Sequence, residues 1–314
     1  MVRIVNPYDA AYRGGVPQFN ARLQRAFAHH GLQVPWEHPD RGGWDPAHDI
    51  LICTNEDAIR IPPEIAVIAV QHGCAQERWD RGGHVASEAF FGAVDGAQRE
   101  AAKRPRTYWV ACSEECAYEY FTHHGYHADR IIINGLDTDL FFPGERQVRK
   151  LGFDDRQGSD THKPVVLHHC VDFCKGKDAI GAVAAELGDE FEVRLLDVPA
   201  AEVPDAMRQA DIFLCLSRLE GCPCVVCEAM ATGLVVVTTD TGLYWREDRP
   251  PGYRFPWTDR DDPYKVVHAI RTAWEYRHDL NPRPWALRWL NLPQFGAAYI
   301  EAVAEAATRF GVRP

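Results

Sequence analysis

Short, nearly continuous apolar segments alternate along this chain with longer segments in which apolar residues recur at helical spacing. The segments VRIVNP, DILICTN and AVIAVQHG are of the first kind. Residues 16–31 are of the second kind, with Val16, Phe19, Leu23 and Phe27 on one face. Strands that are apolar throughout are typical of parallel sheets covered by helices on both faces. The pattern therefore predicts an α/β fold.

A second alternating series follows a polar segment. Residues 144–164 are charged and contain several Gly and Asp, which is typical of a linker. Because 314 residues exceed what one core usually supports, we expect two domains, residues 1–143 and residues 165–290. Residues 291–314 are expected to contain a final helix, whose apolar face includes Phe295. The expected strands of the second domain are VVLHHC, FEVRLL, DIFLCLS and LVVVTT.

Composition and net charge exclude some classes of protein and some kinds of partner. An apolar fraction of 46% with 25% charged residues is globular, and no apolar run approaches the roughly 18 to 20 residues that span a bilayer. The amino terminus lacks a secretory pattern, so we expect a cytoplasmic protein whose ten cysteines are reduced. The formal charge of −11 disfavours nucleic acid as a partner and a broad basic surface for anionic lipid.

The segment from Ser217 to Gly242 holds two glutamates, Glu220 and Glu228, at an expected strand-to-helix turn. A short helix follows the turn, and Gly233 is placed to end it. Since apolar segments flank this unit, the turn opens at the carboxyl end of a parallel strand, where open α/β sheets bind ligands. Amides at the start of the helix favour an anion or a polar sugar at this position.

The order Glu, Gly, any residue, Pro, then a second Glu followed by Ala-Met-Ala, a spacer and Gly resembles the donor-binding motif of family 4 retaining glycosyltransferases. The flanking sequences PDAMRQADIFLCLSRLEG and TTDTG are similar to the same family. The resemblance is strong over residues 205–242 and looser over most of the remaining chain. It implies two Rossmann-like domains facing each other across a cleft, the B-type glycosyltransferase fold. Residues 165–290 would bind the donor, residues 1–143 would lie on the acceptor side, and residues 291–314 would cross back to the first domain.

The resemblance also implies roles for individual residues. Glu228 would hold the ribose hydroxyls of a nucleoside diphosphate sugar, and Glu220 would hold a hydroxyl of the sugar. The loop near Val198 would touch the base. The turn between the two glutamates would bind sugar and phosphate; it consists of Gly221, Cys222, Pro223 and Cys224.

Four further positions match the family. Gly14 and Gly15 precede the first long helix, where glycine lets the backbone approach a diphosphate. Lys175, in DFCKGKD, matches a lysine that neutralises charge on the departing nucleoside diphosphate. His72, in AVIAVQHG, matches a histidine beside the sugar and the acceptor.

One departure from the family concerns the diphosphate. The family has an arginine five residues before the lysine, whereas this chain has Cys170. The site would therefore lack one positive charge unless Lys177, His168 or His169 supplies it.

Three groups of residues invite a metal site, and we reject each. Asp137, Thr138 and Asp139 resemble the paired-aspartate site of the other glycosyltransferase fold, but they lie in the expected interdomain strand. The acids of TDRDD, residues 258–262, are expected to form a solvated loop. The cysteine spacing matches no standard paired site; the cysteines are Cys170, Cys174, Cys222, Cys224 and Cys227. We expect no metal and no cofactor besides the donor substrate.

The sequence thus predicts metal-independent, retaining transfer of a hexose or related sugar from a nucleoside diphosphate sugar to a hydroxyl of a carbohydrate, a lipid-linked molecule or a small molecule. Three alternatives remain. A nucleotide-sugar epimerase shares the fold, and a non-catalytic sugar-nucleotide binding protein would explain the absent arginine. A dehydrogenase has less support, because RGG is not the spaced three-glycine fingerprint of dinucleotide binding.

Overall fold

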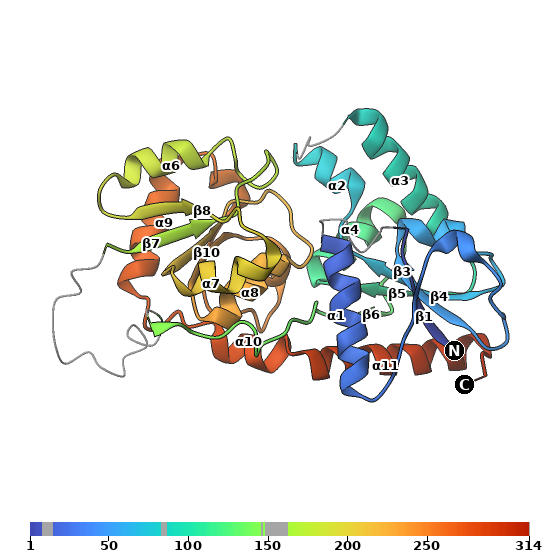
Figure 1. The fold of residues 1–314 in the computed structure, drawn as a ribbon. Helices are drawn as coiled ribbons and strands as arrows, with labels where there is room; N and C mark the ends of the chain where they lie inside the picture. The colour runs from blue at the N-terminus through green and yellow to red at the C-terminus, as the bar shows by residue number, and fades with distance from the viewer. Residues whose placement is uncertain (8–14, 83–86, 146, 148–162, 314) are drawn as a thin grey trace. The chain divides into compact units, whose positions relative to one another are not determined.

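The computed structural model describes residues 1–7, 15–82, 87–145, 147 and 163–313. The chain forms two compact units (Figure 1). The first comprises Met1–Asp80, Ala86–Leu136 and Leu290–Pro314. The second comprises Arg81–Val85 and Asp137–Trp289. Each unit is built around one parallel sheet and is described by itself.

Six strands form the sheet of the first unit, in the order β2-β1-β3-β4-β5-β6, and all pairs are parallel. Every residue of the strands β3, β4 and β5 is buried, as expected for apolar strands covered on both faces. The strand bounds are β1 Val2–Val5, β2 Trp36–Glu37, β3 Ile50–Thr54, β4 Ala66–Gln71, β5 Thr107–Ala111 and β6 Arg130–Ile131.

Helices of the first unit begin and end where local chemistry favours it. Helix α4 begins after Ser113, whose Oγ accepts a hydrogen bond from the amide of Cys116 at 3.1 Å. It ends at Gly125, which has the left-handed conformation that glycine adopts most easily. The helices before the linker are α1 Gly15–His29, α2 Ala75–Asp80, α3 Glu88–Ala102 and α4 Glu114–His124.

The last helix, α11 (Leu292–Phe310), belongs to the first unit, so the chain returns to the first sheet after building the second. Phe295 of α11 lies in the same hydrophobic core as Phe19 of α1. The two helices approach closely at Gly296, where a Cβ would lie 2.5 Å from the carbonyl oxygen of Ala26. The predicted return of the final helix to the first domain is confirmed.

Five parallel strands form the sheet of the second unit, in the order β11-β10-β9-β7-β8. Their bounds are β7 Val165–His168, β8 Glu192–Leu195, β9 Ile212–Cys215, β10 Val235–Thr239 and β11 Tyr253–Phe255. The helices are α6 Ile180–Leu187, α7 Val203–Arg208, α8 Cys224–Thr232, α9 Pro263–Glu275 and α10 Arg283–Trp289. Two parallel sheets with helices confirm the predicted fold class.

The predicted domain limits remain a prediction. Most of the expected linker, residues 144–164, lies outside the described residues. Apart from the short segment Arg81–Val85, the compact units divide between Leu136 and Asp137 and between Trp289 and Leu290.

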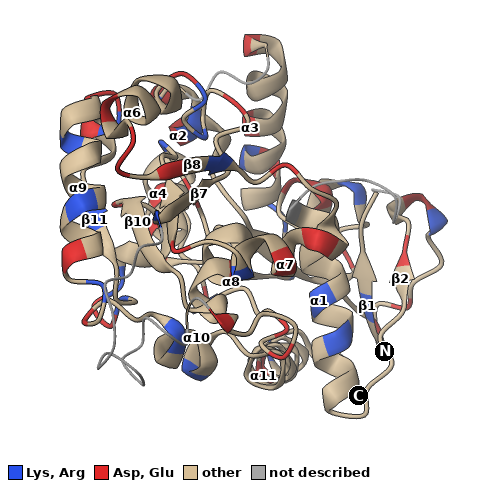
Figure 2. Ribbon diagram, turned by 60° about the vertical axis from the view of Figure 1, so that its left-hand side comes forward, with Lys and Arg blue, Asp and Glu red and all other residues tan. Residues whose placement is uncertain are grey.

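None of the described helices is both long enough and apolar enough to cross a lipid bilayer. Figure 2 shows both signs of charge on α9, which carries Lys265, Arg271 and Glu275. This helix therefore offers no uniformly basic face to an anionic surface.

Replacing Gly296 by alanine should destabilise the first unit. Gly296→Ala is expected to lower the free energy of unfolding by about 1 to 3 kcal/mol, because the new methyl group overlaps the backbone of Ala26. Gly96→Ala in α3 is the matched control, since a Cβ there meets no atom within 4 Å, and it should raise the same quantity by about 0.5 to 1 kcal/mol. Urea denaturation measures both, and equal effects would contradict this packing.

Candidate functional site

The candidate site is built on two adjacent strands of the second unit. Strand β7 ends at His168 and β9 ends at Cys215, and the two strands pair in parallel. The loops that follow them therefore leave the same edge of the sheet. The loop after β7 carries Lys175, and the loop after β9 carries Ser217 and Glu220.

Glu220 joins these two loops through one of its carboxylate oxygens. Lys175 Nζ donates a hydrogen bond to Oε1 of Glu220, and Ser217 Oγ donates to the same oxygen at 2.6 Å. Only 25% of the Lys175 side chain and 10% of the Glu220 side chain are exposed. Among the described residues, Oε2 of Glu220 has no hydrogen-bond partner. The pair thus leaves one carboxylate oxygen for a ligand hydroxyl.

The environment of Lys175 keeps its ammonium group charged. Burial is the largest single effect on the pKa of Lys175 and lowers it, but the charge and the hydrogen bond of Glu220 together with the neighbouring Cys215 and Cys174 raise it, and the net pKa lies above its ordinary value. An ammonium group has three N–H donors, and Glu220 uses one of them. Lys175 can therefore keep this bond and also bind an anion.

Helix α8 begins directly after the turn that follows Glu220. Its N-cap residue is Pro223, which offers no side-chain hydrogen bond, and the first turn contains no acidic residue. The helix's own side chains therefore do not neutralise the positive end of its dipole, which suits a bound anion. Glu228, half-buried, follows in the second turn.

The end of β10 and the loop after it contact the Glu220 turn. Thr239 Oγ1 donates a hydrogen bond to the carbonyl oxygen of Ser217 at 2.7 Å. Gly242 has a positive φ of 62°, and a Cβ on it would lie 2.8 Å from the carbonyl oxygen of Gly221. Only glycine fits this approach, so the TTDTG segment fixes the position of the Glu220 turn.

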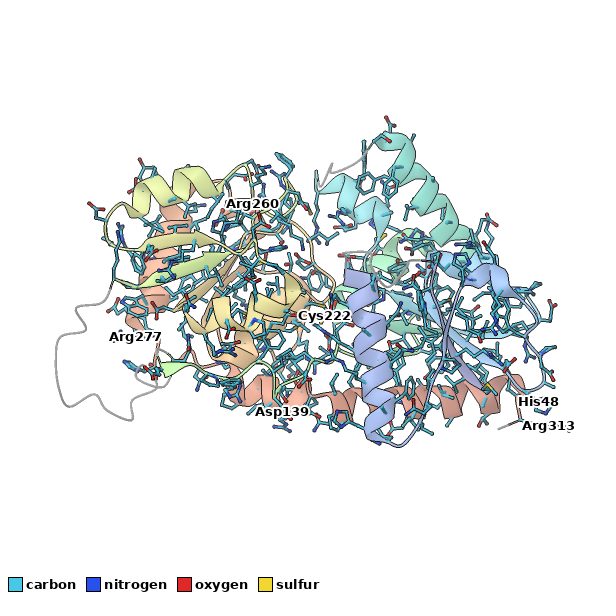
Figure 3. All side chains as sticks on the ribbon, viewed as in Figure 1. His48, Asp139, Cys222, Arg260, Arg277 and Arg313 are labelled. Carbon is cyan, nitrogen blue, oxygen red and sulfur yellow. The ribbon has the colours of Figure 1, made fainter. Side chains whose placement is uncertain are left out.

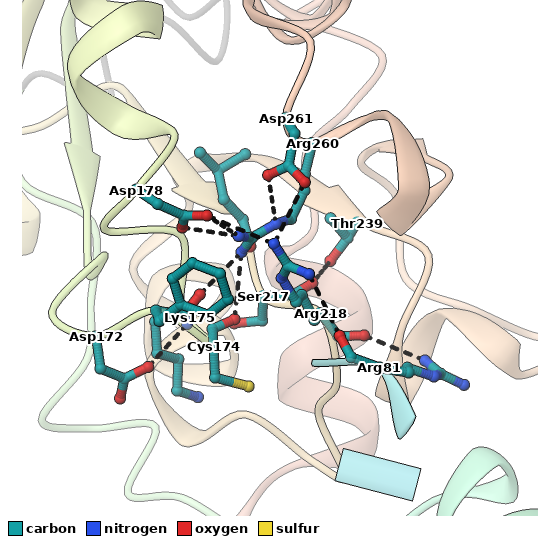
Figure 4. A network of polar contacts seen from close by, with 12 residues as sticks. Arg81, Asp172, Cys174, Lys175, Asp178, Ser217, Arg218, Thr239, Arg260 and Asp261 are labelled. Atoms are coloured by element: carbon teal, nitrogen blue, oxygen red, sulfur yellow. Dashed lines mark hydrogen bonds and ion pairs between the residues drawn. The ribbon is translucent and has the colours of Figure 1, made fainter. Parts of the chain in front are cut away.

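Both loops are anchored by Arg260, whose side chain is completely buried. Nη1 donates hydrogen bonds to the carbonyl oxygens of Phe173 at 3.2 Å and Leu216 at 2.9 Å, which lie on the two loops just described (Figure 4). Nη2 donates to both carboxylate oxygens of Asp178, at 2.7 and 2.8 Å. One guanidinium group therefore holds the Lys175 loop against the Glu220 loop.

The prediction of a solvated loop at residues 258–262 does not hold for Arg260. Asp261 is half-exposed as expected, with 57% of its side chain accessible, but the arginine beside it is buried. An arginine among acids has the pattern of a surface loop, and no periodicity marks this one as internal. Sequence reasoning therefore missed the residue that organises the site.

A second arginine, Arg218, lies in the same network. Its guanidinium group is 4.6 Å from the centre of the Phe173 ring and pairs with Asp178 at 3.5 Å and Asp261 at 3.3 Å. Figure 4 shows both arginines between these two carboxylates. The positive charges of Arg218 and Arg260 are thus engaged within the protein.

Two other predicted donor residues also lie in the second unit. Cys222 is buried in the turn, with its Sγ 3.9 Å from the Sγ of Cys227, and Figure 3 labels it together with Arg260. Val198 lies in the loop after β8 and is 38% exposed. A role for either residue in donor binding remains a prediction.

The remaining predicted residues belong to the first unit. His72 follows β4 and packs edge-on against Phe19, with ring centroids 4.6 Å apart. Burial lowers its pKa to about 4, and its buried Nε2 has no hydrogen-bond partner among the described residues. The imidazole is therefore neutral at pH 7. Gly15 is the first residue of α1, whereas Gly14 lies outside the described residues.

The rejected metal sites have ordinary structural explanations. Asp137 Oδ1 accepts a hydrogen bond from the amide of Asp139 at 3.2 Å and so closes a turn. Among the described residues, one group of three potential ligands lies within 4.8 Å: Glu77, Asp80 and His123, in the first unit. Glu77 and His123 already form an ion pair at 2.7 Å. None of the five cysteines considered above belongs to such a group in the described part of the chain.

Comparison with known proteins agrees with this geometry. Residues 173–275, which include Lys175, both glutamates and Arg260, match the family described as "Glycosyl transferases group 1". The matched residues lie within the second unit. No curated protein matches the chain significantly.

Solved structures resemble nearly the whole chain. Sucrose-phosphate synthase from Thermosynechococcus elongatus has a TM-score of 0.71 at 15% identity, covering 97% of this chain and 99% of that chain. HepE from Anabaena, solved with UDP-glucose, has a TM-score of 0.69 at 14% identity with the same coverage. WaaG, a glycosyltransferase involved in lipopolysaccharide biosynthesis, has a TM-score of 0.59 at 16% identity, covering 98% and 99%. The chain therefore has the B-type glycosyltransferase fold.

Removing the Arg260 guanidinium should cost the second unit much of its stability. Arg260→Met is expected to lower the free energy of unfolding by about 3 kcal/mol, because it leaves buried carbonyl groups and Asp178 without their donor. Arg271→Met, which breaks the exposed ion pair with Glu190, should cost far less, because solvent screens exposed charges. Urea denaturation compares the two variants, and a small loss for Arg260→Met would contradict the anchoring role.

Proposed function

We propose that this protein is a retaining glycosyltransferase that moves a hexose or related sugar from a nucleoside diphosphate sugar to a hydroxyl acceptor without a metal ion. The observation that carries the proposal is the cluster of Lys175, Ser217 and Glu220 beside the start of α8. It combines a charged ammonium group, an available carboxylate oxygen and an uncapped helix end. A diphosphate needs the cation and the amides, and a sugar needs the carboxylate.

Each residue has a distinct part in the proposed donor site. Lys175 and the amides of the turn bind the diphosphate, and Glu220 accepts a hydrogen bond from a sugar hydroxyl. Glu228 holds the ribose hydroxyls, and the loop at Val198 touches the base. Family resemblance adds His72 beside the sugar and acceptor, together with Gly14 and with Gly15 at the start of α1.

The proposed reaction is a displacement on one face of the sugar. The acceptor oxygen forms a bond to the anomeric carbon as the bond from that carbon to the diphosphate oxygen breaks. The departing phosphate takes the proton of the acceptor hydroxyl. Lys175 and the helix amides stabilise the negative charge that grows on the diphosphate. The sugar keeps its anomeric configuration because both bonds lie on the same face.

The stereochemistry of the product tests this proposal. HepE, with the same fold, has been solved with UDP, with UDP and glucose, and with UDP-glucose, so UDP-glucose is the first donor to try. Nuclear magnetic resonance of the product should show an α linkage from this α donor. A β linkage would contradict the same-face reaction, and conversion of the donor without an acceptor would indicate an epimerase.

The two glutamates should differ in what their variants lose. Glu228→Gln is expected to raise the donor KM and to weaken binding of the nucleoside diphosphate, because ribose lies far from the reacting bond. Glu220→Gln should lower kcat by about 10- to 100-fold and leave nucleoside diphosphate binding nearly intact, because a charged hydrogen bond of about 1.5 to 3 kcal/mol acts on the reacting sugar. Enzyme kinetics and calorimetry on both variants measure these effects. If Glu220→Gln weakens nucleotide binding more than Glu228→Gln does, the roles assigned to the two glutamates are wrong.

Chelation should leave turnover unchanged. The proposed leaving-group stabilisation uses Lys175 and backbone amides, so activity in excess EDTA should equal activity with magnesium. A loss that a divalent ion specifically restores would show that a metal performs this step.

A further inference from the structure

The proposed diphosphate site lacks the arginine of the family pattern. Cys170 occupies the position where the family pattern has arginine, and its side chain is buried. Its Sγ lies 3.5 Å from where a Cβ of Gly176 would be, so it packs beneath the Lys175 loop. Burial raises the pKa of this thiol to about 12, and the group is therefore neutral at physiological pH.

The two arginines near the site are engaged within the protein, and His168 is uncharged. Arg218 and Arg260 each pair with both Asp178 and Asp261. Next to Cys170, His168 is buried, and its Nδ1 accepts a hydrogen bond from the amide of Cys170 at 3.2 Å. Burial lowers the pKa of His168 to about 4, so it carries no charge at neutral pH.

His169 differs from His168 and the two arginines in where it lies and in which of its ring nitrogens is available. It lines the same small hollow as Lys175, Ser217 and Glu220. Its Nδ1 lies 3.2 Å from the carbonyl oxygen of Leu196. Because a carbonyl oxygen only accepts hydrogen bonds, Nδ1 carries the proton, and Nε2 is the nitrogen that gains a proton when the ring becomes charged. Among the described residues, no polar atom bonds to Nε2.

We propose that His169 takes the place of the missing arginine by donating a charged hydrogen bond from Nε2 to the donor's diphosphate. This inference rests on the proposed function. Lys175 and His169 would then bind the diphosphate together, one as a permanent cation and the other as a cation that forms when the ligand arrives. A bound dianion favours the protonated imidazole, so donor binding and proton uptake are linked.

Several charged groups set the field around this ring. His168 precedes it, Glu220 and Lys175 share its hollow, and the elements around it carry further charges. The neighbouring segments carry Asp172, Lys175, Lys177 and Asp178 on its own loop, Asp197 after β8, Arg218 and Glu220 after β9, Glu228 on α8, and His168 at the end of β7. Of the two histidines, His168 does not gain its proton until about pH 4, so it does not titrate in the neutral range.

Calorimetric titration with UDP-glucose tests the proposal. The diphosphate of a nucleotide sugar has no proton that titrates near neutral pH, so a change in its affinity reports on the protein. An imidazole gains its proton between about pH 5 and about pH 8. The wild-type protein should bind UDP-glucose about tenfold more tightly at the acidic end of this range, and at neutral pH it should take up a fraction of a proton on binding. Buffers of different ionisation enthalpy measure that uptake.

Three variants isolate the residue. His169→Gln should abolish proton uptake and flatten the pH dependence, with an affinity near that of the wild type at the alkaline end. His169→Arg should bind tightly at every pH in the range. Lys177→Gln is the control, because this exposed lysine was the other local source of charge, and it should behave as the wild type.

The outcomes separate the two levels of the proposal. Binding of UDP-glucose by the wild type without proton uptake, or with the same pH dependence in His169→Gln, would overturn the role of His169 and leave the proposed function standing. Loss of the pH dependence in Lys177→Gln would overturn it as well. Failure of the wild type to bind UDP-glucose and the ADP-, GDP- and dTDP-sugars would contradict the proposed function itself. The wild-type measurement remains decisive even if a His169 variant does not fold.

Discussion

The rest of the site depends on one buried guanidinium group. Arg260 bonds to carbonyl oxygens on the loops after β7 and β9 and to both oxygens of Asp178. A parallel sheet brings these loops to one edge, but it does not fix the distance between their side chains. Multiple hydrogen bonds from one rigid, planar group supply that precision. Lys175 and Glu220 are thereby held facing each other, as a preorganised site requires.

The charges of the site leave the ammonium group of Lys175 and one carboxylate oxygen of Glu220 for a ligand. Arg260 and Arg218 are balanced by Asp178 and Asp261. Glu220 balances Lys175 through Oε1 while Oε2 stays available, and the start of α8 has no acidic residue in its first turn. An anion beside a polar hydroxyl-bearing group is the ligand that completes this set, and a nucleoside diphosphate sugar has both parts.

The sequence predicts the fold well because its strands are buried on both faces and therefore read as apolar runs. It also places Glu220 at a strand-to-helix turn at the edge of the sheet, whereas Lys175 is suggested by the family resemblance. It does not predict Arg260, since burial of an arginine depends on partners scattered from Phe173 to Leu216. Nor does the sequence show which of the two histidines at the end of β7 lies at the site. His168 and His169 are adjacent in the chain, and His169 is the one that lines the hollow with Lys175 and Glu220.

Hydrogen–deuterium exchange on the complete chain, with and without UDP-glucose, tests the central claim most directly. The account predicts slower exchange of backbone amides at residues 168–177 and 217–228 when the ligand binds, because these loops and the first turn of α8 would contact the diphosphate and the sugar. Peptides from α9 should serve as the internal reference and remain unchanged. Calorimetric binding of UDP-glucose without protection at those two segments would contradict the assignment of the donor site.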